Sequence, residues 1–416
     1  MNQRATQSPS VDVAVVGGGI VGLGIAWAVT QTGRSVTVID AAPATGATEA
    51  AAGMLAPVSE LHYQEEHLLD LMLASAALYP GFIESLTPFG GDTGYQKTRT
   101  IMVGADAADR RALADLRQVQ TSHGLKVDTL TIREAREREP LLSPQLSSAS
   151  SIQHDHQVDP RRLATAIMTA LAKTAAASGD GRNPFESQNA ERLLRADPDA
   201  DADTNSSRVT GVVLSDGSII EAAEVIVANG LAATQLGALP DTLRLPLRPV
   251  YGDIIRLRVP EHLRPLVTAT IRGVVRGVPV YLVPREDGTL VIGATQREDG
   301  NAGISAGGIH QLLRDAQILV PAVAELEIIE VMARARPGTP DNAPLLGRVR
   351  GARGEADAPI PGLLIATGFF RHGVLLMPAA AQICADLLDG VTDPRWAPFA
   401  PDRFSSPSST AKAAAL

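Results

Sequence analysis

The stretch VDVAVVGGGIVGLGIAWAVTQTGRSVTVID, residues 11–40, decides the fold class of this chain. A short β-rich apolar run at residues 11–16 precedes three glycines, and a helical stretch follows at residues 20–32. A second apolar run, residues 35–39, leads directly to Asp40. Strand, turn, helix and strand within about thirty residues form a βαβ unit, which is typical of a parallel sheet.

The glycines of this stretch fit the fingerprint of a dinucleotide-binding turn. Residues 17–22, GGGIVG, match G-x-G-x-x-G after a strand and at the start of a helix. Gly17 allows the tight turn, Gly19 lets the backbone approach a pyrophosphate, and Gly22 allows the helix to pack closely on the sheet. Asp40 follows Gly22 by eighteen residues, where a carboxylate would accept ribose hydroxyls. We therefore expect an adenine dinucleotide site in preference to a bland glycine turn, although the motif does not distinguish FAD from NAD.

Composition excludes several classes of partner. The 416 residues include 37 basic and 46 acidic side chains, a net charge of −9, and only 3% are aromatic. A protein that stacks nucleic-acid bases needs more rings and more positive charge, so neither nucleic acid nor an anionic membrane is expected to bind. The single cysteine, Cys384, lies in an apolar run and is expected to be a buried structural thiol, with no cysteine-based metal site. This cysteine usage and the polar N-terminus predict a cytoplasmic protein.

Apolar periodicity indicates further elements along the chain, α/β near both ends with a strand-rich middle. Helices are expected at residues 68–86, 161–176 and 378–388, and strands at residues 224–228, 250–259, 278–294 and 363–366. Residues 179–207 are polar, and their acidic part is typical of a surface loop or insertion.

The segment after the second strand narrows the choice of cofactor. Residues 46–57, GATEAAAGMLAP, carry small side chains that let backbone amides approach a flat, polar-edged ring; the alternative is an alanine-rich helix start. With this run the chain resembles the D-amino-acid-oxidase-like family of flavoenzymes, and within it the glycine oxidases of thiamin biosynthesis. Further matches follow in the family's order at residues 158–160, 225–230, 248–250, 281–295, 336–339 and 368–378.

The resemblance implies an α/β fold in two parts with non-covalently bound FAD, in a homo-oligomer that family analogy makes a tetramer. A Rossmann-like FAD-binding domain is expected from residues 11–92, 157–244 and 332–392, an antiparallel-sheet substrate domain from residues 93–156 and 245–331, and tails at residues 1–10 and 393–416.

Three residues are predicted to act on the substrate. Arg336, before Pro and Gly, presents a rigid fork suited to a carboxylate, and the resemblance assigns it to the substrate carboxylate; the alternative is a structural ion pair. Tyr281 matches the family tyrosine that hydrogen-bonds the same carboxylate, the alternative being a core ring. Arg371 would place charge beside the substrate amine. Tyr251 and Gln296 are predicted to line the same cavity; the alternative for Tyr251 is core packing.

The resemblance also implies which residues hold the flavin. In relatives the loop matching residues 368–376 lies against the flavin, and the start of the following helix stabilises its anionic reduced form. The predicted cofactor-binding residues are Gly17, Gly19, Ile20, Val21, Gly22, Asp40, Ala41, Thr48, Ala51, Ala52, Gly53, Met54, Gly230, Gly368, Arg371, His372, Gly373, Val374 and Leu375. Three positions depart from the family: Glu49 replaces a Trp, Phe369 a His, and Gln296 a Met that lines the glycine pocket in some members.

The implied reaction is hydride transfer from the α-carbon of glycine, a small amine or a D-amino acid to the flavin, with O₂ as the final acceptor and hydrogen peroxide as its product. The imino acid would then yield a 2-oxo acid and ammonia, or supply thiamin thiazole synthesis. The alternatives are a D-amino-acid dehydrogenase or sarcosine-type enzyme of the same fold, a non-enzymatic flavin-binding module, and an NAD-dependent dehydrogenase.

Overall fold

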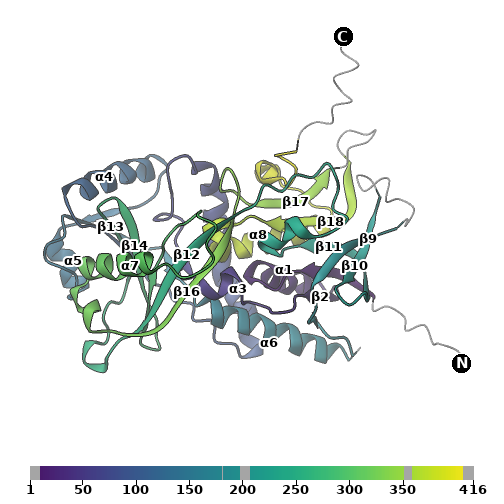
Figure 1. Ribbon diagram of the computed structural model, residues 1–416, viewed down its shortest axis with the longest axis horizontal. Helices are drawn as coiled ribbons and strands as arrows, with labels where there is room; N and C mark the ends of the chain where they lie inside the picture. The colour runs from purple at the N-terminus through teal and green to yellow at the C-terminus, as the bar shows by residue number, and fades with distance from the viewer. Residues whose placement is uncertain (1–9, 180, 197–206, 351–357, 406–416) are drawn as a thin grey trace, which may run out of the picture.

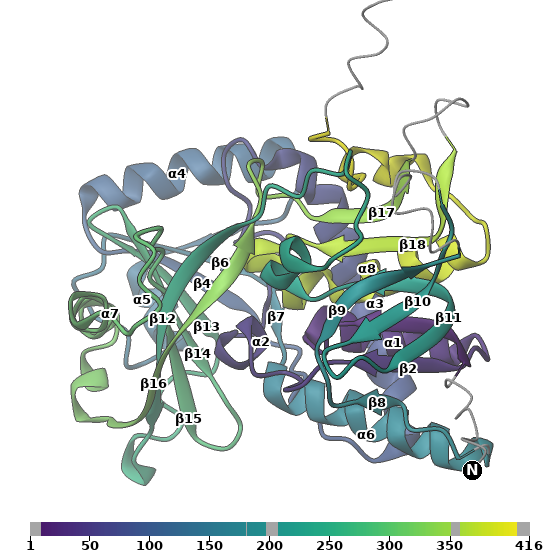
Figure 2. The ribbon, with the colours of Figure 1, turned by 45° about the vertical axis from the view of Figure 1, so that its right-hand side comes forward.

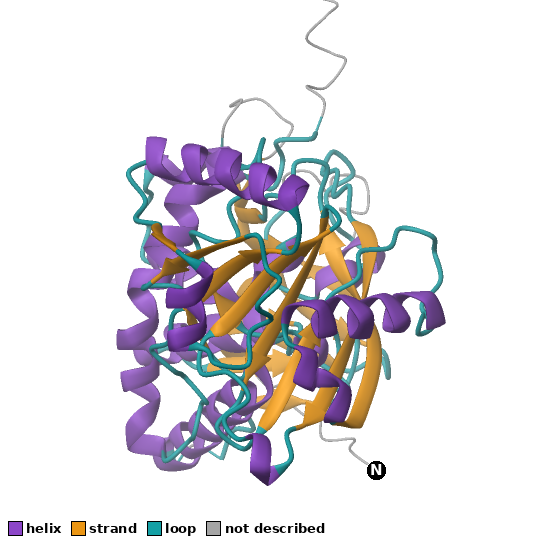
Figure 3. Cartoon of the chain, turned by 90° about the vertical axis from the view of Figure 1, so that its left-hand side faces the viewer, coloured by secondary structure: helices purple, strands orange, loops and turns teal. Residues whose placement is uncertain are grey.

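The computed structural model describes residues 10–179, 181–196, 207–350 and 358–405. Two eight-stranded sheets form its framework, the first toward the right of Figure 1 and the second toward the left. Helices lie outside the strands, as Figure 3 shows. The arrangement is a mixed α/β fold, as the βαβ unit predicts.

The first sheet has the strand order β17-β18-β11-β1-β2-β8, with β10 and β9 attached beside β11. β1 pairs in parallel with β2 and β11, and β11 pairs in parallel with β18, so the predicted βαβ unit lies at the centre of this sheet. Its strands are β1 (Ser10–Val16), β2 (Val36–Ile39), β8 (Phe185–Glu186), β9 (Ala190–Arg195), β10 (Val209–Leu214), β11 (Ile219–Val227), β17 (Leu345–Arg350) and β18 (Pro359–Thr367).

A layer of helices covers one face of this sheet. The helices are α1 (Ile20–Gln31), α3 (Leu69–Leu86), α6 (Pro160–Ser178) and α8 (Gly373–Leu388). Alternation along β1 sends Val13 and Val15 into the core beneath these helices, while Ala14 and Val16 belong to the core on the opposite face. α1 packs against both α6 and α8 and is apolar around its circumference, which is why nine of its residues are buried.

The second sheet has the order β16-β12-β15-β14-β13-β4-β6-β5 and is antiparallel except where β13 meets β4. Figure 2 shows its long strands β12 and β16 side by side. Its strands are β4 (Thr100–Gly104), β5 (Asp128–Leu130), β6 (Ser148–Ile152), β12 (Arg248–Arg258), β13 (Thr270–Val275), β14 (Val278–Pro284), β15 (Thr289–Gly293) and β16 (Glu327–Gly338). The helices α4 (Ala107–Ser122), α5 (Ile132–Arg138) and α7 (Ala306–Leu319) accompany this sheet, and α2 (Ala47–Ala50), β3 (Met54–Leu55) and β7 (His156–Gln157) lie between the two sheets.

Several boundaries differ from those expected from the sequence. β16 pairs with β12 along its length and so crosses the predicted domain boundary at residue 332. α8 begins at Gly373, five residues before the predicted start, because Pro378 is accommodated inside the helix. Residues 179–207 contain β8 and β9, and residues 197–206 lie outside the described residues.

The predicted C-terminal tail is wrong for residues 393–405. Pro394–Phe399 forms a 3₁₀ helix in which Phe399 is buried in the core beneath α8. Arg403 then donates to both carboxylate oxygens of Asp341, at 2.9 Å each. An aromatic anchor and a bidentate ion pair therefore fix this segment on the first sheet's domain. Residues 406–416 and 1–9 lie outside the described residues.

One described helical stretch, Glu66–Phe89, is long and apolar enough to cross a membrane by length and composition. Tyr79 within it donates to the backbone oxygen of Val374 at 2.5 Å, and Ser75 donates to that of Leu375 at 2.6 Å. These contacts attach the stretch to α8, as in a core helix.

Candidate active site

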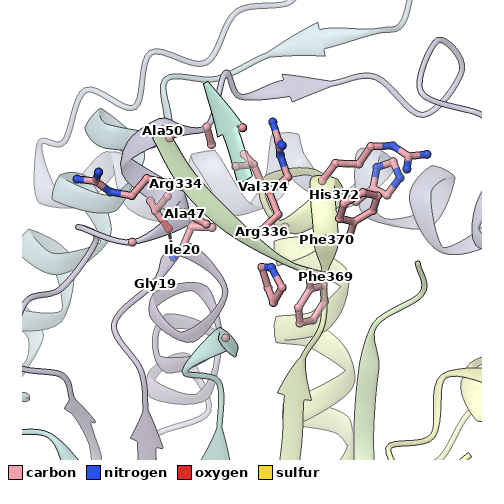
Figure 4. A pocket seen from close by; sticks show the side chains of 18 of the residues that line it. Gly19, Ile20, Ala47, Ala50, Arg334, Arg336, Phe369, Phe370, His372 and Val374 are labelled. Atoms are coloured by element: carbon pink, nitrogen blue, oxygen red, sulfur yellow. Dashed lines mark hydrogen bonds between the residues drawn. The ribbon is translucent and has the colours of Figure 1, made fainter. Parts of the chain in front are cut away.

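A cavity of about 570 Å³ lies between the two sheets. The glycine turn, the segment 40–54 and the start of α8 line one side, and strands β12, β13, β14 and β16 contribute to the other. Figure 4 shows side chains that line it from β16, from the loop before α8 and from the start of α1. The fold therefore joins the predicted dinucleotide turn and the predicted substrate residues in one space.

The three fingerprint glycines have different roles. Gly17 has φ +111°, and a Cβ there would lie 2.6 Å from the backbone oxygen of Ala228. A Cβ on Gly22 would lie 2.0 Å from the oxygen of Gly17. Both glycines therefore permit close backbone packing and do not line the cavity. Gly19 does line it, and a Cβ on Gly19 would meet Thr48 Oγ1 at an ordinary 3.6 Å.

Asp40 follows β2 directly and lines the cavity. Its Oδ2 accepts from the amide of Gly18 at 2.6 Å, and its Oδ1 accepts from the amide of Ala42 at 2.8 Å. Each carboxylate oxygen keeps a further lone pair for a ribose hydroxyl. Ala42 lines the cavity and Ala41 does not, which corrects the predicted contact of Ala41 by one residue.

The α2 segment is tied to both domains. Thr48 Oγ1 accepts from the amide of Ile20 at the start of α1, at 2.9 Å. Arg334 on β16 donates to the carboxylate of Glu49 at 2.5 Å and to the oxygen of Thr45 at 3.0 Å. Glu49, where relatives have Trp, thus provides an ion pair that holds the segment against the second sheet. Arg334 therefore has a structural role in this segment.

The loop before α8 forms another wall of the cavity. Gly368 has φ +74° and the non-glycine Phe370 has φ 47°, so the chain turns sharply here. His372 is buried, and its Nε2 has no hydrogen-bond partner among the described residues. Burial and the neighbouring Arg371 lower the pKa of His372 well below its usual value, so the ring is neutral. The positive end of the α8 dipole faces the cavity beside it.

Arg336 and Tyr281 come together across the second sheet because two glycines lie between them. A Cβ on Gly252 would lie 2.3 Å from Arg336 Nη1, and a Cβ on Gly293 would lie 2.3 Å from the Tyr281 hydroxyl. Tyr281 acts to raise the pKa of Arg336, and Arg336 acts to lower that of Tyr281, so the two side chains interact electrostatically. Burial raises the pKa of Tyr281 although the nearby arginines act against it, so the hydroxyl stays protonated.

Arg336 has no carboxylate within ion-pair distance among the residues that the structure describes. Its Nη1 donates to the backbone oxygen of Thr295 at 3.3 Å. Burial lowers its pKa, yet a guanidinium keeps its proton in proteins. A half-buried cation without a carboxylate at ion-pair distance, next to a protonated hydroxyl, is suited to a ligand carboxylate.

Arg272 and Glu60 are among the charged residues of the cavity that were not identified from the sequence. Arg272 lies on β13 directly opposite Tyr281 on β14, and Glu60 follows β3. The two form an ion pair, with side chains 11% and 9% exposed. Burial and the neighbouring Arg371 lower the pKa of Arg272 to about 10. The sequence signal for Arg272 was a charged residue within the otherwise uncharged run TIRGVV, residues 270–275.

Arg371 lines the cavity, but its surroundings differ from the expectation. It forms ion pairs with Glu65 and, at 3.4 Å, with Glu60. Burial acts to raise the pKa of Glu65, but Arg371 and a hydrogen bond from Asn342 lower it below its usual value. The charge of Arg371 is therefore balanced by protein carboxylates, whereas that of Arg336 is not.

The two remaining predicted substrate residues, Gln296 and Tyr251, differ in whether they line the cavity. Gln296 lines the cavity. Tyr251 does not, because it alternates with Gly252 on β12 and its ring lies on the other side, under Arg297 at 5.9 Å. The prediction for Tyr251 is wrong for this reason.

The cavity suits a flat, polar-edged group attached to a dinucleotide. Asn229 Oδ1 and His372 Nε2 both lie at the cavity and lack partners among the described residues. The predicted cofactor residues that line it are Gly19, Ile20, Val21, Asp40, Thr48, Ala51, Ala52, Gly53, Met54, Gly230, Gly368, Arg371, His372, Gly373, Val374 and Leu375.

Comparison with known proteins agrees with this geometry. The chain is 31% identical over 383 residues to glycine oxidase of Geobacillus kaustophilus, covering 91% of this chain and 93% of the relative. The crystal structure of a glycine oxidase from the same organism superposes with a TM-score of 0.80 at 30% identity, covering 95% of this chain and 99% of that one. The bifunctional protein ThiO/ThiG of Trichormus variabilis is 30% identical over 402 residues, 96% of this chain.

The chain spans about half the length of that bifunctional relative, 56% of it. The family model described as FAD dependent oxidoreductase, DAO, matches residues 12–387. This match includes the glycine turn, both sheets and α8. The chain therefore belongs to the DAO family of FAD-dependent oxidoreductases.

Proposed function

We propose that this enzyme oxidises glycine and other small amino acids or amines to the imino acid, with O₂ as electron acceptor. Bound FAD supplies the two-electron acceptor for the substrate hydride. The imino acid is hydrolysed to a 2-oxo acid and ammonia, and reduction of O₂ gives hydrogen peroxide. The observation that carries the proposal is the half-buried cation Arg336, which lines the cavity, has no carboxylate within ion-pair distance among the described residues and faces Tyr281 across Gly252 and Gly293.

The chain's own residues would align the substrate. Arg336 and the Tyr281 hydroxyl bind the carboxylate from two directions, which fixes the orientation of the α-carbon. The partial enclosure of Arg336 and Tyr281 by the cavity walls strengthens this charge interaction. His372 is neutral and buried, so it adds no charge against the substrate ammonium. The substrate must lose one ammonium proton before hydride transfer, so activity is expected to fall at low pH.

The name ThiO of the bifunctional relatives supports a place in thiamin biosynthesis, where the imino acid from glycine would supply thiazole synthesis. We extend the proposal to a homotetramer in the cytoplasm with non-covalent FAD, on the resemblance to glycine oxidases. Light scattering on the purified holoenzyme measures the first of these: a mass of four chains supports the tetramer, and a monomer contradicts it.

Oxygen uptake against glycine, sarcosine, D-alanine and D-proline tests the activity. Peroxide formed at one equivalent per turnover with glycine is the expected result. Dye reduction without oxygen uptake would instead indicate a dehydrogenase, and inert glycine with active bulky D-amino acids would contradict the glycine assignment. Arg336→Ala should lower kcat/KM by about 100-fold or more because it removes the cation that binds the substrate carboxylate.

A further inference from the structure

Two further cations of the cavity, Arg272 and Arg371, already bind a protein carboxylate, that of Glu60. Glu60 lies between Arg272 and Arg371: one carboxylate oxygen contacts Arg272 Nη1, and the other lies 3.4 Å from Arg371 Nε. All three side chains line the cavity, and none is more than 17% exposed. A carboxylate is thus bound between two guanidinium groups inside the predicted substrate space.

This group is adjacent to the residues predicted to bind the substrate. Arg272 and Tyr281 are directly opposed in the β13–β14 register, so their Cβ atoms are about 5 Å apart. Tyr281 in turn lies over Gly293 and Arg336 over Gly252, on two paired strands, so the two side chains approach each other. One guanidinium, a hydroxyl and a second guanidinium therefore follow one another across the sheet, and the two arginines flank the tyrosine.

Within the group formed by Arg272, Arg336, Arg371, Glu60 and Glu65, the charges balance when one ligand carboxylate is present. Asp253 also acts on Arg336, but its ion pair is with Arg297. Glu60 and Glu65 compensate Arg272 and Arg371, which leaves the charge of Arg336. A substrate carboxylate at Arg336 makes the group neutral. A second ligand carboxylate near Arg272 would meet Glu60, and like charges in a buried site repel strongly.

The backbone around Glu60 is held in place from the second sheet's side. Asp155 accepts from the amides of Val58 and Ser59, at 3.2 and 2.9 Å. Gln120 donates to the oxygen of Val58 at 2.9 Å. Because three hydrogen bonds fix the residues just before it, Glu60 is presented on a rigid segment.

We propose that Arg272 and Arg371 form a second anion site that Glu60 fills, so that the cavity accepts one substrate carboxylate and rejects a second. This inference rests on the proposed function only in placing the first carboxylate at Arg336. Glu60 is then the residue that determines specificity between monocarboxylate and dicarboxylate ligands. A substitution that removes the charge of Glu60 but keeps the shape of its side chain should make the second anion site available to a ligand carboxylate.

Ligand binding to the wild-type holoenzyme gives the first test, followed by the change in FAD absorbance and without turnover. Acetate should bind at least about tenfold more tightly than malonate or succinate, because a second carboxylate meets Glu60. Equal or tighter binding of the dicarboxylates overturns the inference. Failure of every amino acid to be oxidised would contradict the proposed function alone, since this comparison needs no reaction.

The variant Glu60→Gln gives the second test. Succinate or malonate should bind about tenfold more tightly than to wild type, and the kcat/KM ratio of D-aspartate to glycine should rise by a similar factor. Glu60→Gln combined with Arg272→Gln should lose most of this gain, because one of the two cations is gone. Glu49→Gln is the matched control: it removes the same charge from the pair with Arg334 and should leave the ligand preference unchanged.

Glu60→Ala takes the place of Glu60→Gln if the latter does not retain FAD. It also removes the carboxylate and leaves Arg272 and Arg371 without it, so dicarboxylate binding should again become tighter. An unchanged preference for monocarboxylates in whichever variant retains FAD contradicts a role for Glu60 in specificity.

Discussion

The guanidinium of Arg336 lies against the backbone of Gly252, so closely that a Cβ at Gly252 would be 2.3 Å from Nη1. The two residues are on neighbouring strands, and the glycine leaves the space through which the arginine reaches Tyr281. The position of the Arg336 guanidinium thus depends on the absence of a side chain at Gly252.

Gly252→Ala should therefore displace Arg336 and lower kcat/KM for glycine by about 100-fold, because a misplaced binding group loses its alignment. FAD content should change little. Gly307→Ala is the control, since a Cβ there meets only Ser305 Oγ, at an ordinary 3.9 Å. Steady-state kinetics and the flavin spectrum measure both effects, and full activity in Gly252→Ala would contradict the contact.

Tyr281→Phe should raise KM for glycine by about tenfold, the effect of one lost hydrogen bond to a charged group. Tyr251→Phe is the matched control, because that ring lies outside the cavity under Arg297. Equal effects in the two variants would show that Tyr281 has no particular role in binding the substrate.

Cys384 should be unreactive in the native protein. Burial raises the pKa of its thiol to about 12, so almost no thiolate forms near pH 8. A thiol-reactive dye should therefore modify the folded protein very slowly and label the chain's single cysteine rapidly in guanidinium chloride. Rapid labelling of the native protein would mean that α8 opens readily.

The protein should lose stability as the pH falls from 6.5 toward 4. Burial and Arg371 lower the pKa of His62 from 6.5 to about 4, so the unfolded chain gains this proton before the folded one. The stabilisation is present above pH 6.5 and is lost as the pH falls through 4, about 2 kcal/mol after allowance for the partial exposure of the ring. Urea unfolding with excess FAD should show a smaller pH dependence for His62→Gln.

The exposed His123→Gln serves as the control for this measurement. Its unfolding should retain the pH dependence of the wild type. An identical slope in His62→Gln and wild type would show that His62 does not carry the effect.

Glu49→Gln should weaken FAD binding only slightly. Its ion pair with Arg334 is partly exposed, at 29% and 39%, and such pairs contribute about 0.2–1 kcal/mol, a change of about 1.4- to fivefold in the FAD dissociation constant. Release of FAD followed by its fluorescence measures this constant.

Acid precipitation should leave the flavin in the supernatant, and a yellow pellet would contradict non-covalent binding.

Local patterns determined much of this protein. The βαβ unit, the glycine turn and Asp40 were predicted from residues 11–40, because periodicity and turn chemistry act between neighbours in the chain. Arg336 and Tyr281 were identified as candidates from short motifs and a family resemblance. Their placement at one cavity was an expectation from that resemblance and was not a consequence of periodicity.

Only the tertiary structure decided which charges meet. Glu60, Arg272 and Arg371 come from distant parts of the chain, and no local pattern indicates that one carboxylate lies between the two arginines. Strand alternation, in a register set by β12 and β16, places Gly252 at the cavity and Tyr251 away from it. The sequence by itself thus determined the glycine turn and the class of cofactor, an adenine dinucleotide, because these follow from residues close together in the chain. The charge balance depends on long-range contacts that form only when the two sheets fold around one cavity.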